Sequence, residues 1–271
     1  MSRWTNRPEG SNWGEFGADD QIGRLNLITP ERVRAAAAEV KAGERFCLSL
    51  PLDMPGGNLL NPTVRSGDRP NMNYNLSQDD PSMIDVICDD LVVLHTQYSS
   101  QWDSLAHVGQ EFDADGDGKA EIVYYNGYRG GEHICGPQDE GGSRAHALGI
   151  ENMAAVGVQG RGVMIDLEGE FSWAQTMVGY DDLMRVMDKD NVTVEEGDMV
   201  CLHTGFAQMI MEMGGTPDKE KLHNSCAALD GRDGKLLNWI MPLKRIHRAP
   251  GKEVVLFCQS TSIAFSSSAY T

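Results

Sequence analysis

The feature that most constrains this sequence is the alternation of short apolar runs with segments of helical spacing. GVMIDL at 162–167 and MVCLHT at 199–204 each predict a strand. Between them, Leu183, Val186 and Met187 share one face of a helix predicted over 180–188. Short strands interspersed with helices favour an α/β fold, which we expect to form one domain over residues 1–271. Further strands are predicted at 45–52 and 91–95, short helices at 149–158 and 235–240, a turn at 113–118 and a long irregular segment at 53–85.

The first predicted helix carries the clearest start signal. Thr29 is a suitable N-cap, and Pro30 suits the first helical position. The Ala-rich run continues to Val40, and Gly43 is placed to follow the end of the helix.

Charge and hydropathy exclude several classes of function. Of the 271 residues, 40 are Asp or Glu and 23 are Lys or Arg, so the formal net charge is −17. Nucleic acids and anionic membranes need basic patches, so we expect neither as a partner and expect a small-molecule substrate instead. No apolar stretch reaches the ~18 residues of a transmembrane helix, and the N-terminal sequence lacks the apolar core of a secretory signal. We therefore expect a cytoplasmic location, with the six cysteines as free, mostly buried thiols.

The densest group of chemically active side chains is HTQYSSQWDSLAHVG at 95–109. It follows a predicted strand, and ligand sites of α/β proteins gather where strands end. Asp103 and His107, four residues apart, are suited to converge on a metal or to form an acid/base pair. A hydrogen-bonded structural loop is the alternative interpretation. No Walker loop, no G-x-G-x-x-G after a strand and no G-x-S-x-G elbow is present, which disfavours nucleotide and α/β-hydrolase chemistry.

Three other patterns give weaker signals. DADGDGKAE at 113–121 imitates a calcium loop, but Tyr124 stands where a bidentate Glu belongs, which favours a solvated acidic turn. His203 ends a predicted strand and is interpreted as structural. His133 lies in a Gly-rich loop, where we expect a surface role.

Four segments, considered together, match the pattern of one family. They are SNWGEFGADDQIGRLNLITPERV (11–33), YSSQWDSLAHVG (98–109), GRGVMIDL (160–167) and EEGDMVCLHTGF (195–206). The set resembles the cyclase family of metal-dependent hydrolases, which includes bacterial kynurenine formamidase and isatin hydrolase, over roughly residues 11–238. Residues 98–109 lie where the signature H-x-G-T-H-x-D-x-P-x-H of that family belongs.

The resemblance implies a single-domain swivelling β/β/α fold, usually assembled as a homo-oligomer, that hydrolyses an amide, formamide or lactam through a metal-activated water. Asp103 and His107 occupy the positions of the signature's Asp and last His, while Gln97 and Gln101 replace its first two His ligands. Gln97, Gln101 and Asp103 would form an oxygen-only metal site, which is harder than the family's imidazole site. We expect a divalent metal, Mn²⁺ or Zn²⁺, or else a metal-free acid/base pair. This Gln-Trp-Asp variant of the loop resembles a subgroup of the family.

The resemblance also suggests roles for the loop residues. Asp103 would be a metal ligand, and His107 would take the proton of the attacking water and return it to the leaving nitrogen. Trp102 and Tyr98 would stack against an aryl substrate. A non-catalytic family member that binds a small molecule in the same pocket is the alternative, and a calcium-binding module is a weaker one.

The segment 241–271 departs from the family. The resemblance implies further metal-site residues, a His and a Glu, in a segment similar to L-P-x-H-E-x-C-L, and nothing similar follows Trp239. Codons allowed for 257–271, read two bases later, can encode LPVYEHCLFKLGVY, which resembles the missing segment. We therefore expect residues from about 241 onward to be out of frame relative to relatives. A naturally divergent tail is the alternative, and the coding DNA distinguishes the two.

Overall fold

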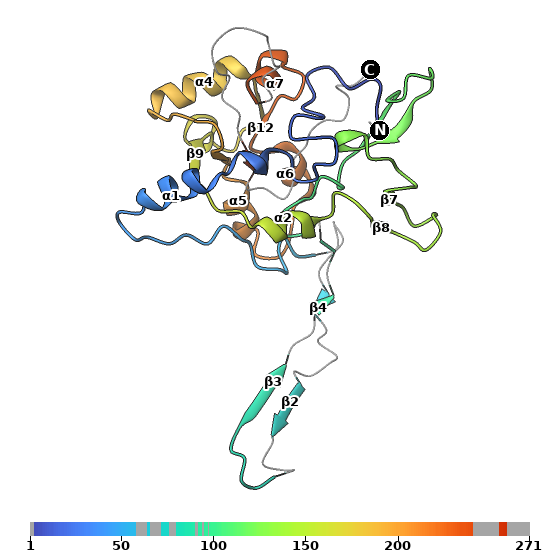
Figure 1. The fold of residues 1–271 in the computed structure, drawn as a ribbon. Helices are drawn as coiled ribbons and strands as arrows, with labels where there is room; N and C mark the ends of the chain where they lie inside the picture. Colours follow the sequence, from blue (N-terminus) through green and yellow to red (C-terminus); the bar gives the residue numbers. More distant parts are fainter. Residues whose placement is uncertain are drawn as a thin grey trace.

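A three-stranded parallel sheet has the order β13–β11–β9. Its strand β9 lies within the body of the molecule (Figure 1). The computed structural model describes residues 3–57, 64–65, 72–75, 80–89, 92–93, 95–96, 98–240 and 255–258. The strands are β9 (Gly162–Asp166), β11 (Met199–His203) and β13 (Val255–Cys258). Met199 lies opposite Gly162, and His203 lies opposite Asp166, so β9 and β11 end at the same edge. Both strands that the sequence predicted most clearly are confirmed.

The main core covers one face of this sheet. Ile165 and Val200 are fully buried, and they belong to the same apolar cluster as Leu183 and Val186 of helix α4 (Tyr180–Lys189). Helix α7 (Gly234–Ile240) joins the cluster through Leu236. The helical spacing that predicted α4 is therefore confirmed, and its apolar face packs onto the sheet.

The remaining elements are short and surround this centre. The helices are η1 (Gly23–Leu27), α1 (Pro30–Ala38), η3 (Tyr125–Gly127), α2 (Ile150–Val156), α3 (Glu168–Phe171), α5 (Phe206–Glu212) and α6 (Lys219–Asn224). The strands are β1 (Val64–Arg65), β2 (Met72–Asn75), β3 (Val86–Asp89), β4 (Val92–Val93), β5 (Gln110–Phe112), β6 (Glu121–Val123), β7 (Ile134–Cys135), β8 (Arg144–Ala145), β10 (Thr176–Val178) and β12 (Ala227–Leu229). β10 and β12 pair in parallel, whereas β1–β4, β2–β3, β5–β6 and β7–β8 are antiparallel pairs.

Helix α1 begins where the sequence predicts it. Thr29 has extended backbone geometry, and its hydroxyl accepts a hydrogen bond from the N–H of Arg32. Such a cap satisfies one of the free N–H groups at the start of a helix. The helix ends at Ala38, two residues before the predicted end.

The predicted strand at 45–52 is wrong. These residues form no strand, and Phe46 is 78% exposed. No described strand pairs with them, and a side-chain contact takes the place of a ladder, with Ser99 Oγ donating to the carbonyl oxygen of Pro51 at 2.9 Å. Cys47 is exposed as a result, Cys135 and Cys201 are half-buried, and only Cys226 among the described cysteines is buried, so the expectation of mostly buried thiols is wrong for this part of the chain.

A two-stranded hairpin extends away from the body. β2 and β3 pair antiparallel and lie at the far end of the projection in Figure 1. The expected irregular segment 53–85 therefore contains β1 and β2, and within the strand predicted at 91–95 the described residues Val92–Val93 form β4. Within the described residues, no helix has the length and apolar character needed to cross a bilayer.

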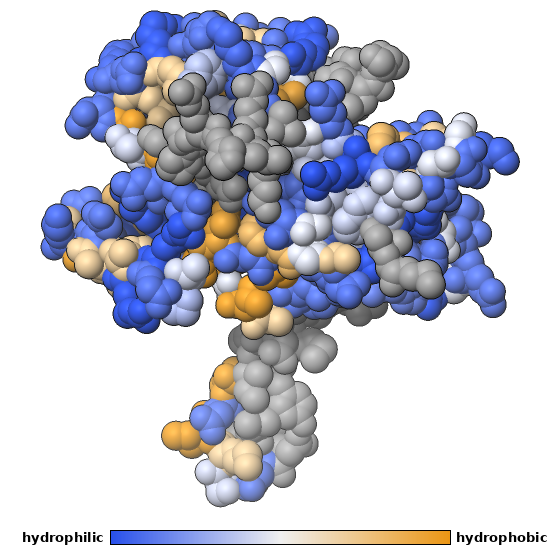
Figure 2. All heavy atoms as spheres, turned by 45° about the horizontal axis from the view of Figure 1, so that its top comes forward, coloured by the Kyte–Doolittle hydropathy of each residue, from blue (hydrophilic) through white to orange (hydrophobic). Residues whose placement is uncertain are grey.

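The second face of the central sheet is open. Side chains alternate along a strand, so Met164 and Asp166 of β9 point away from the core, as do Cys201 and His203 of β11. Met164 is 44% exposed. Figure 2 shows apolar surface gathered in the middle of one side of the molecule, between hydrophilic margins.

Candidate functional site

The predicted site loop begins at a buried tyrosine. Tyr98 is 1% exposed, and its hydroxyl accepts a hydrogen bond from the N–H of Gly56 at 2.7 Å. Beside it, the N–H of Leu50 donates to Ser100 Oγ at 2.8 Å. Tyr98 therefore ties residues 50–56 to the loop, and its stacking on a substrate stays a prediction.

The next residues of the loop face solvent. Gln101 and Trp102 are exposed, Trp102 by 44%, and His107 is exposed as well, whereas Asp103 is half-buried. No hydrogen bond joins the side chains of Asp103 and His107. Gln97 lies outside the described residues. The metal-binding and acid/base roles of these residues stay predictions.

A tight turn fixes the spacing between Asp103 and His107. The N–H of His107 donates to the carbonyl oxygen of Ser104 at 3.1 Å. Leu105 and Ala106, in the middle of the turn, pack against the apolar cluster of Tyr128. The turn is therefore held both by hydrogen bonds within it and by the packing of Leu105 and Ala106.

A cavity of about 780 Å³ lies next to this loop. Residues 47–51 and 100–102 line it together with the open face of β9 and β11 and with helix α5. Most lining side chains are apolar, and Gln101 and Gln208 are among the few polar ones. Ligand cavities of proteins have this character and measure roughly 300–1,000 Å³.

A histidine–carboxylate pair stands where the open sheet face ends. His203 Nδ1 lies 2.7 Å from Asp166 Oδ1. Partial burial opposes the charged carboxylate, but hydrogen bonds from the N–H of Gly169 and from His203 outweigh it and hold the pKa of Asp166 below its usual range. This contact keeps His203 in a fixed orientation, which agrees with the structural role that the sequence suggested for it.

Glu168 lies close to this pair, and the sequence analysis identified neither Glu168 nor Asp166 as a candidate site residue. One donor atom each from Asp166, Glu168 and His203 lies within 4.8 Å of the other two. The sequence does contain one signal for these residues, because Asp166 and His203 lie at the ends of the two apolar runs that predict strands. Ligand sites of α/β proteins gather where strands end, and this applies to Asp166 and His203 as much as to the loop at 95–109.

The family is decided by comparison with known sequences. The family model for cyclases matches residues 46–258. The chain belongs to the cyclase family. A crystal structure of a novel cyclase is similar, with a TM-score of 0.58 and 27% sequence identity over 82% of this chain and 69% of that one. No curated protein matches the sequence.

Both the family and the α/β fold expected from the sequence are thus confirmed. The match of the cyclase model includes the loop 98–109, the two core strands and β13. β13 lies within the segment 241–271, most of which is outside the described residues. The hypothesis that this segment is out of frame stays a prediction.

The acidic turn of this cyclase is held by its own carboxylates. Asp113 Oδ1 accepts hydrogen bonds from the N–H groups of Gly116 and Asp117, at 2.7 and 3.1 Å. Asp113 Oδ2 accepts one from Gly118 at 3.0 Å. The predicted turn is confirmed. The three aspartates also offer oxygens within 4.8 Å of one another, so a calcium site there stays a prediction.

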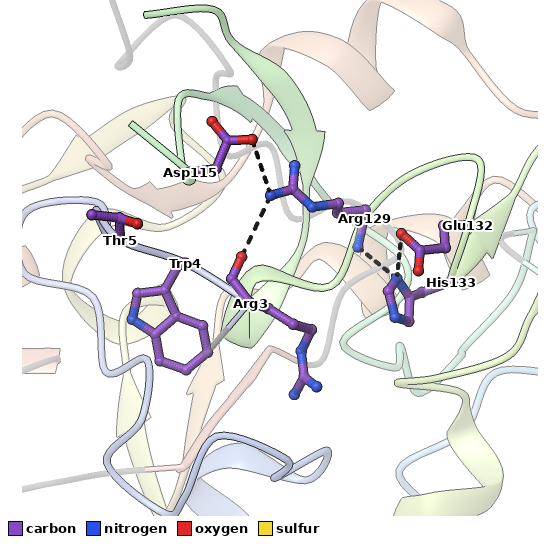
Figure 3. A pocket seen from close by; sticks show the side chains of 7 residues that line it. All are labelled: Arg3, Trp4, Thr5, Asp115, Arg129, Glu132 and His133. Carbon is purple, nitrogen blue, oxygen red and sulfur yellow. Dashed lines mark hydrogen bonds and ion pairs between the residues drawn. The ribbon is translucent and has the colours of Figure 1, made fainter. Parts of the chain in front are cut away.

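A second, polar pocket of about 360 Å³ lies between the N-terminal segment and the loop around His133 (Figure 3). Its charged groups are satisfied by one another. Arg129 lies between Asp115, 3.6 Å away, and Glu121, 2.6 Å away, and its backbone N–H donates to His133 Nδ1 at 3.2 Å. Arg129 also donates to the backbone carbonyl of Arg3, so this pocket fastens the N-terminal segment to the body of the cyclase.

Proposed function

We propose that this cyclase hydrolyses the C–N bond of an amide, formamide or lactam in the cavity beside Gln101 and Trp102. The observation that carries the proposal is the position of that cavity. Its wall contains Gln101 and Trp102, from the loop at which the family signature falls. The loop that resembles the family signature thus lines a cavity of suitable size for a small ligand, which supports the proposal.

The described residues do not fit a metal at this loop. Among the described residues, neither Asp103 nor His107 belongs to a group of three or more converging His, Cys, Asp or Glu donors. Carboxamide oxygens such as that of Gln101 are weaker donors than imidazole nitrogens. We therefore derive the reaction from the side chains alone.

In the proposed reaction, His107 accepts a proton from water as the water oxygen attacks the carbonyl carbon. The amide N–H₂ of Gln101 donates to the carbonyl oxygen, on which negative charge develops. His107 then returns the proton to the leaving nitrogen, and the products are a carboxylic acid and an amine. The negative charge of Asp103, which makes no hydrogen bond to His107, favours the protonated imidazole through space, and the half-exposed ring of Trp102 stacks on a planar substrate.

The test is hydrolysis of N-formyl aryl amides and cyclic amides by the full chain. We expect Asp103→Asn and His107→Gln to lower kcat/KM by about 10²–10⁴-fold, which is the usual contribution of general acid–base catalysis. Asp117→Asn and His146→Gln are matched controls, because both side chains are exposed and neither residue lines the cavity. Full activity of Asp103→Asn would contradict the role proposed for Asp103. An unchanged pH–rate profile of His107→Gln would contradict the role of His107 as the general base.

A non-catalytic binding protein is the second candidate. The observation that favours it is Gln101, which stands in the loop where the family signature has a His. Such a protein would bind the same compounds without turnover. Binding beside Trp102 should change the tryptophan fluorescence of the protein, and Trp102→Phe should abolish that change. Turnover by the unmodified chain would exclude this candidate.

Self-association is also proposed, as the family resemblance suggests. The apolar side chains of Ile84 and Val86, 91% and 59% exposed, lie on and beside the projecting hairpin and are suited to contact a second copy. Light scattering coupled to size exclusion would measure the mass. A monomer at micromolar concentration would contradict this expectation.

A further inference from the structure

The carboxyl edge of β9 and β11 presents two metal-binding side chains on one side of the sheet. Asp166 and His203 are register partners, so both project from the open face. Their side chains are 47% and 44% exposed, respectively. An ion in solution can therefore reach both without any movement of the core.

Glu168 completes a set of three donors. It is the first residue of α3, two positions beyond Asp166, and its carboxylate converges with the other two donors to within 4.8 Å. Around one ion with ligand distances of about 2.0–2.2 Å, two ligand atoms lie at most about 4.4 Å apart. At tetrahedral angles the ligand atoms lie about 3.5 Å apart, so side-chain shifts of up to about 1 Å bring all three donors into one coordination sphere.

The charge of Glu168 is not compensated by the described residues. No described side chain forms a hydrogen bond or ion pair with its carboxylate. Two residues further on, Glu170 pairs with Arg185 and Lys189. Burial raises the pKa of the Cys226 thiol, and the charge of Glu168 raises it further. The neighbourhood of Glu168 is thus electrically negative, as a cation site is before it binds its ion.

A tightly packed turn encloses the other side of Glu168. Gly205 has φ +75°, and a Cβ there would lie 2.6 Å from Trp173 Nε1 and 2.7 Å from Glu168 Cγ. Trp173 Nε1 is buried and has no hydrogen-bond partner. A buried donor is costly without an acceptor. A Glu168 carboxylate drawn into coordination, or a water held by the same ion, is suited to supply one.

We propose that Asp166, Glu168 and His203 bind one divalent transition metal ion, Zn²⁺ or Mn²⁺. The donor set of one imidazole and two carboxylates suits these ions, whereas Ca²⁺ and Mg²⁺ take oxygen ligands. Three protein ligands leave further positions open, as at metal centres that act on a substrate. The proposed site is separate from the loop residues Asp103 and His107, and it does not rest on the proposed hydrolysis.

The test is metal binding by the full chain, freed of metal with a chelator and then dialysed against Zn²⁺ or Mn²⁺. We expect about one ion per chain. Glu168→Gln and His203→Ala should each weaken binding by more than about 100-fold, because even residues behind the ligands contribute about 10–100-fold. Glu170→Gln is the matched control on the same helix and should leave the affinity unchanged, as should Asp103→Asn.

Several results overturn the proposal. One is the absence of saturable binding of either ion to folded protein. Another is binding that Asp103→Asn abolishes and Glu168→Gln preserves, since this would place the ion at the loop. Glu168→Gln is isosteric and removes no described contact, so circular dichroism should show an unchanged fold. Because no substrate is used, a negative result here is distinct from a failure of the proposed hydrolysis.

Discussion

The starts of β9 and β11 are joined by a charged pair whose two members differ in burial. Arg161 Nε lies 2.9 Å from Asp198 Oδ1, and Arg161 Nη2 lies 2.6 Å from Oδ2. The Asp198 side chain is 6% exposed, whereas that of Arg161 is 31% exposed. This asymmetry leads to a quantitative prediction about which partner is harder to remove.

Removing the arginine should cost more than removing the aspartate. Arg161→Met retains an apolar stem but leaves a buried Asp198 carboxylate with only the N–H of Glu195, at 2.6 Å. An uncompensated buried charge of this kind costs about 3–5 kcal/mol of unfolding free energy. Asp198→Ala leaves a partly solvated guanidinium that still reaches the carbonyl oxygen of Thr193, at 3.3 Å, so the cost is about 1–3 kcal/mol.

Urea denaturation at neutral pH measures both values, provided that the slope m is unchanged. Arg34→Met is the control, because Arg34 and Glu31 form an exposed pair whose loss should leave the unfolding free energy almost unchanged. The reasoning is refuted if Arg161→Met costs less than Asp198→Ala, or if it costs less than about 1 kcal/mol.

Three further predictions concern stability. Hydrogen bonds from the N–H groups of Tyr180 and, more weakly, Lys235 hold the pKa of Asp233 below its usual range. Its stabilising contribution is therefore present above the unfolded pKa of about 4 and is lost as the pH falls through the folded pKa, so Asp233→Asn should flatten the decline of Tm between about pH 5 and pH 3. Leu183→Ala should lower the unfolding free energy in urea by about 3 kcal/mol, because the side chain is fully buried; a loss below about 1 kcal/mol would contradict this. Gly205→Ala should cost about 1–3 kcal/mol, since φ is +75° and the new Cβ meets an indole ring; an unchanged Tm would show that the turn relaxes.

Capping residues and helical spacing predicted helices α1 and α4 correctly, because both signals depend on residues close together in the sequence. The Thr29 cap and the spacing of Leu183 and Val186 depend on neighbours within a turn or two of helix, and α1 and α4 form where expected. The apolar run at 45–52 predicts a strand but forms none, because composition does not reveal whether a partner strand exists. Helix α5 escaped notice because it begins directly after β11, at a glycine in the left-handed conformation.

The site was harder to predict than the fold, because its parts are distant in sequence. Gln101 and Trp102 were identified from the loop itself, and both line the main cavity. Asp166 and His203 come together only because β9 and β11 are adjacent, parallel and in one register. Strand order and register arise from the packing of the whole core, and a single sequence does not display them.

The order β13–β11–β9 has a consequence for the growing chain on the ribosome. β13 follows β11 by about fifty residues, so β11 has one unpaired edge after β9 has joined it. At roughly 5–20 residues per second, synthesis of that interval lasts about 3–10 s. An unpaired edge strand is a template for pairing with another chain. The yield of native protein should therefore depend on whether a chaperone shields this edge until residues 255–258 have been made.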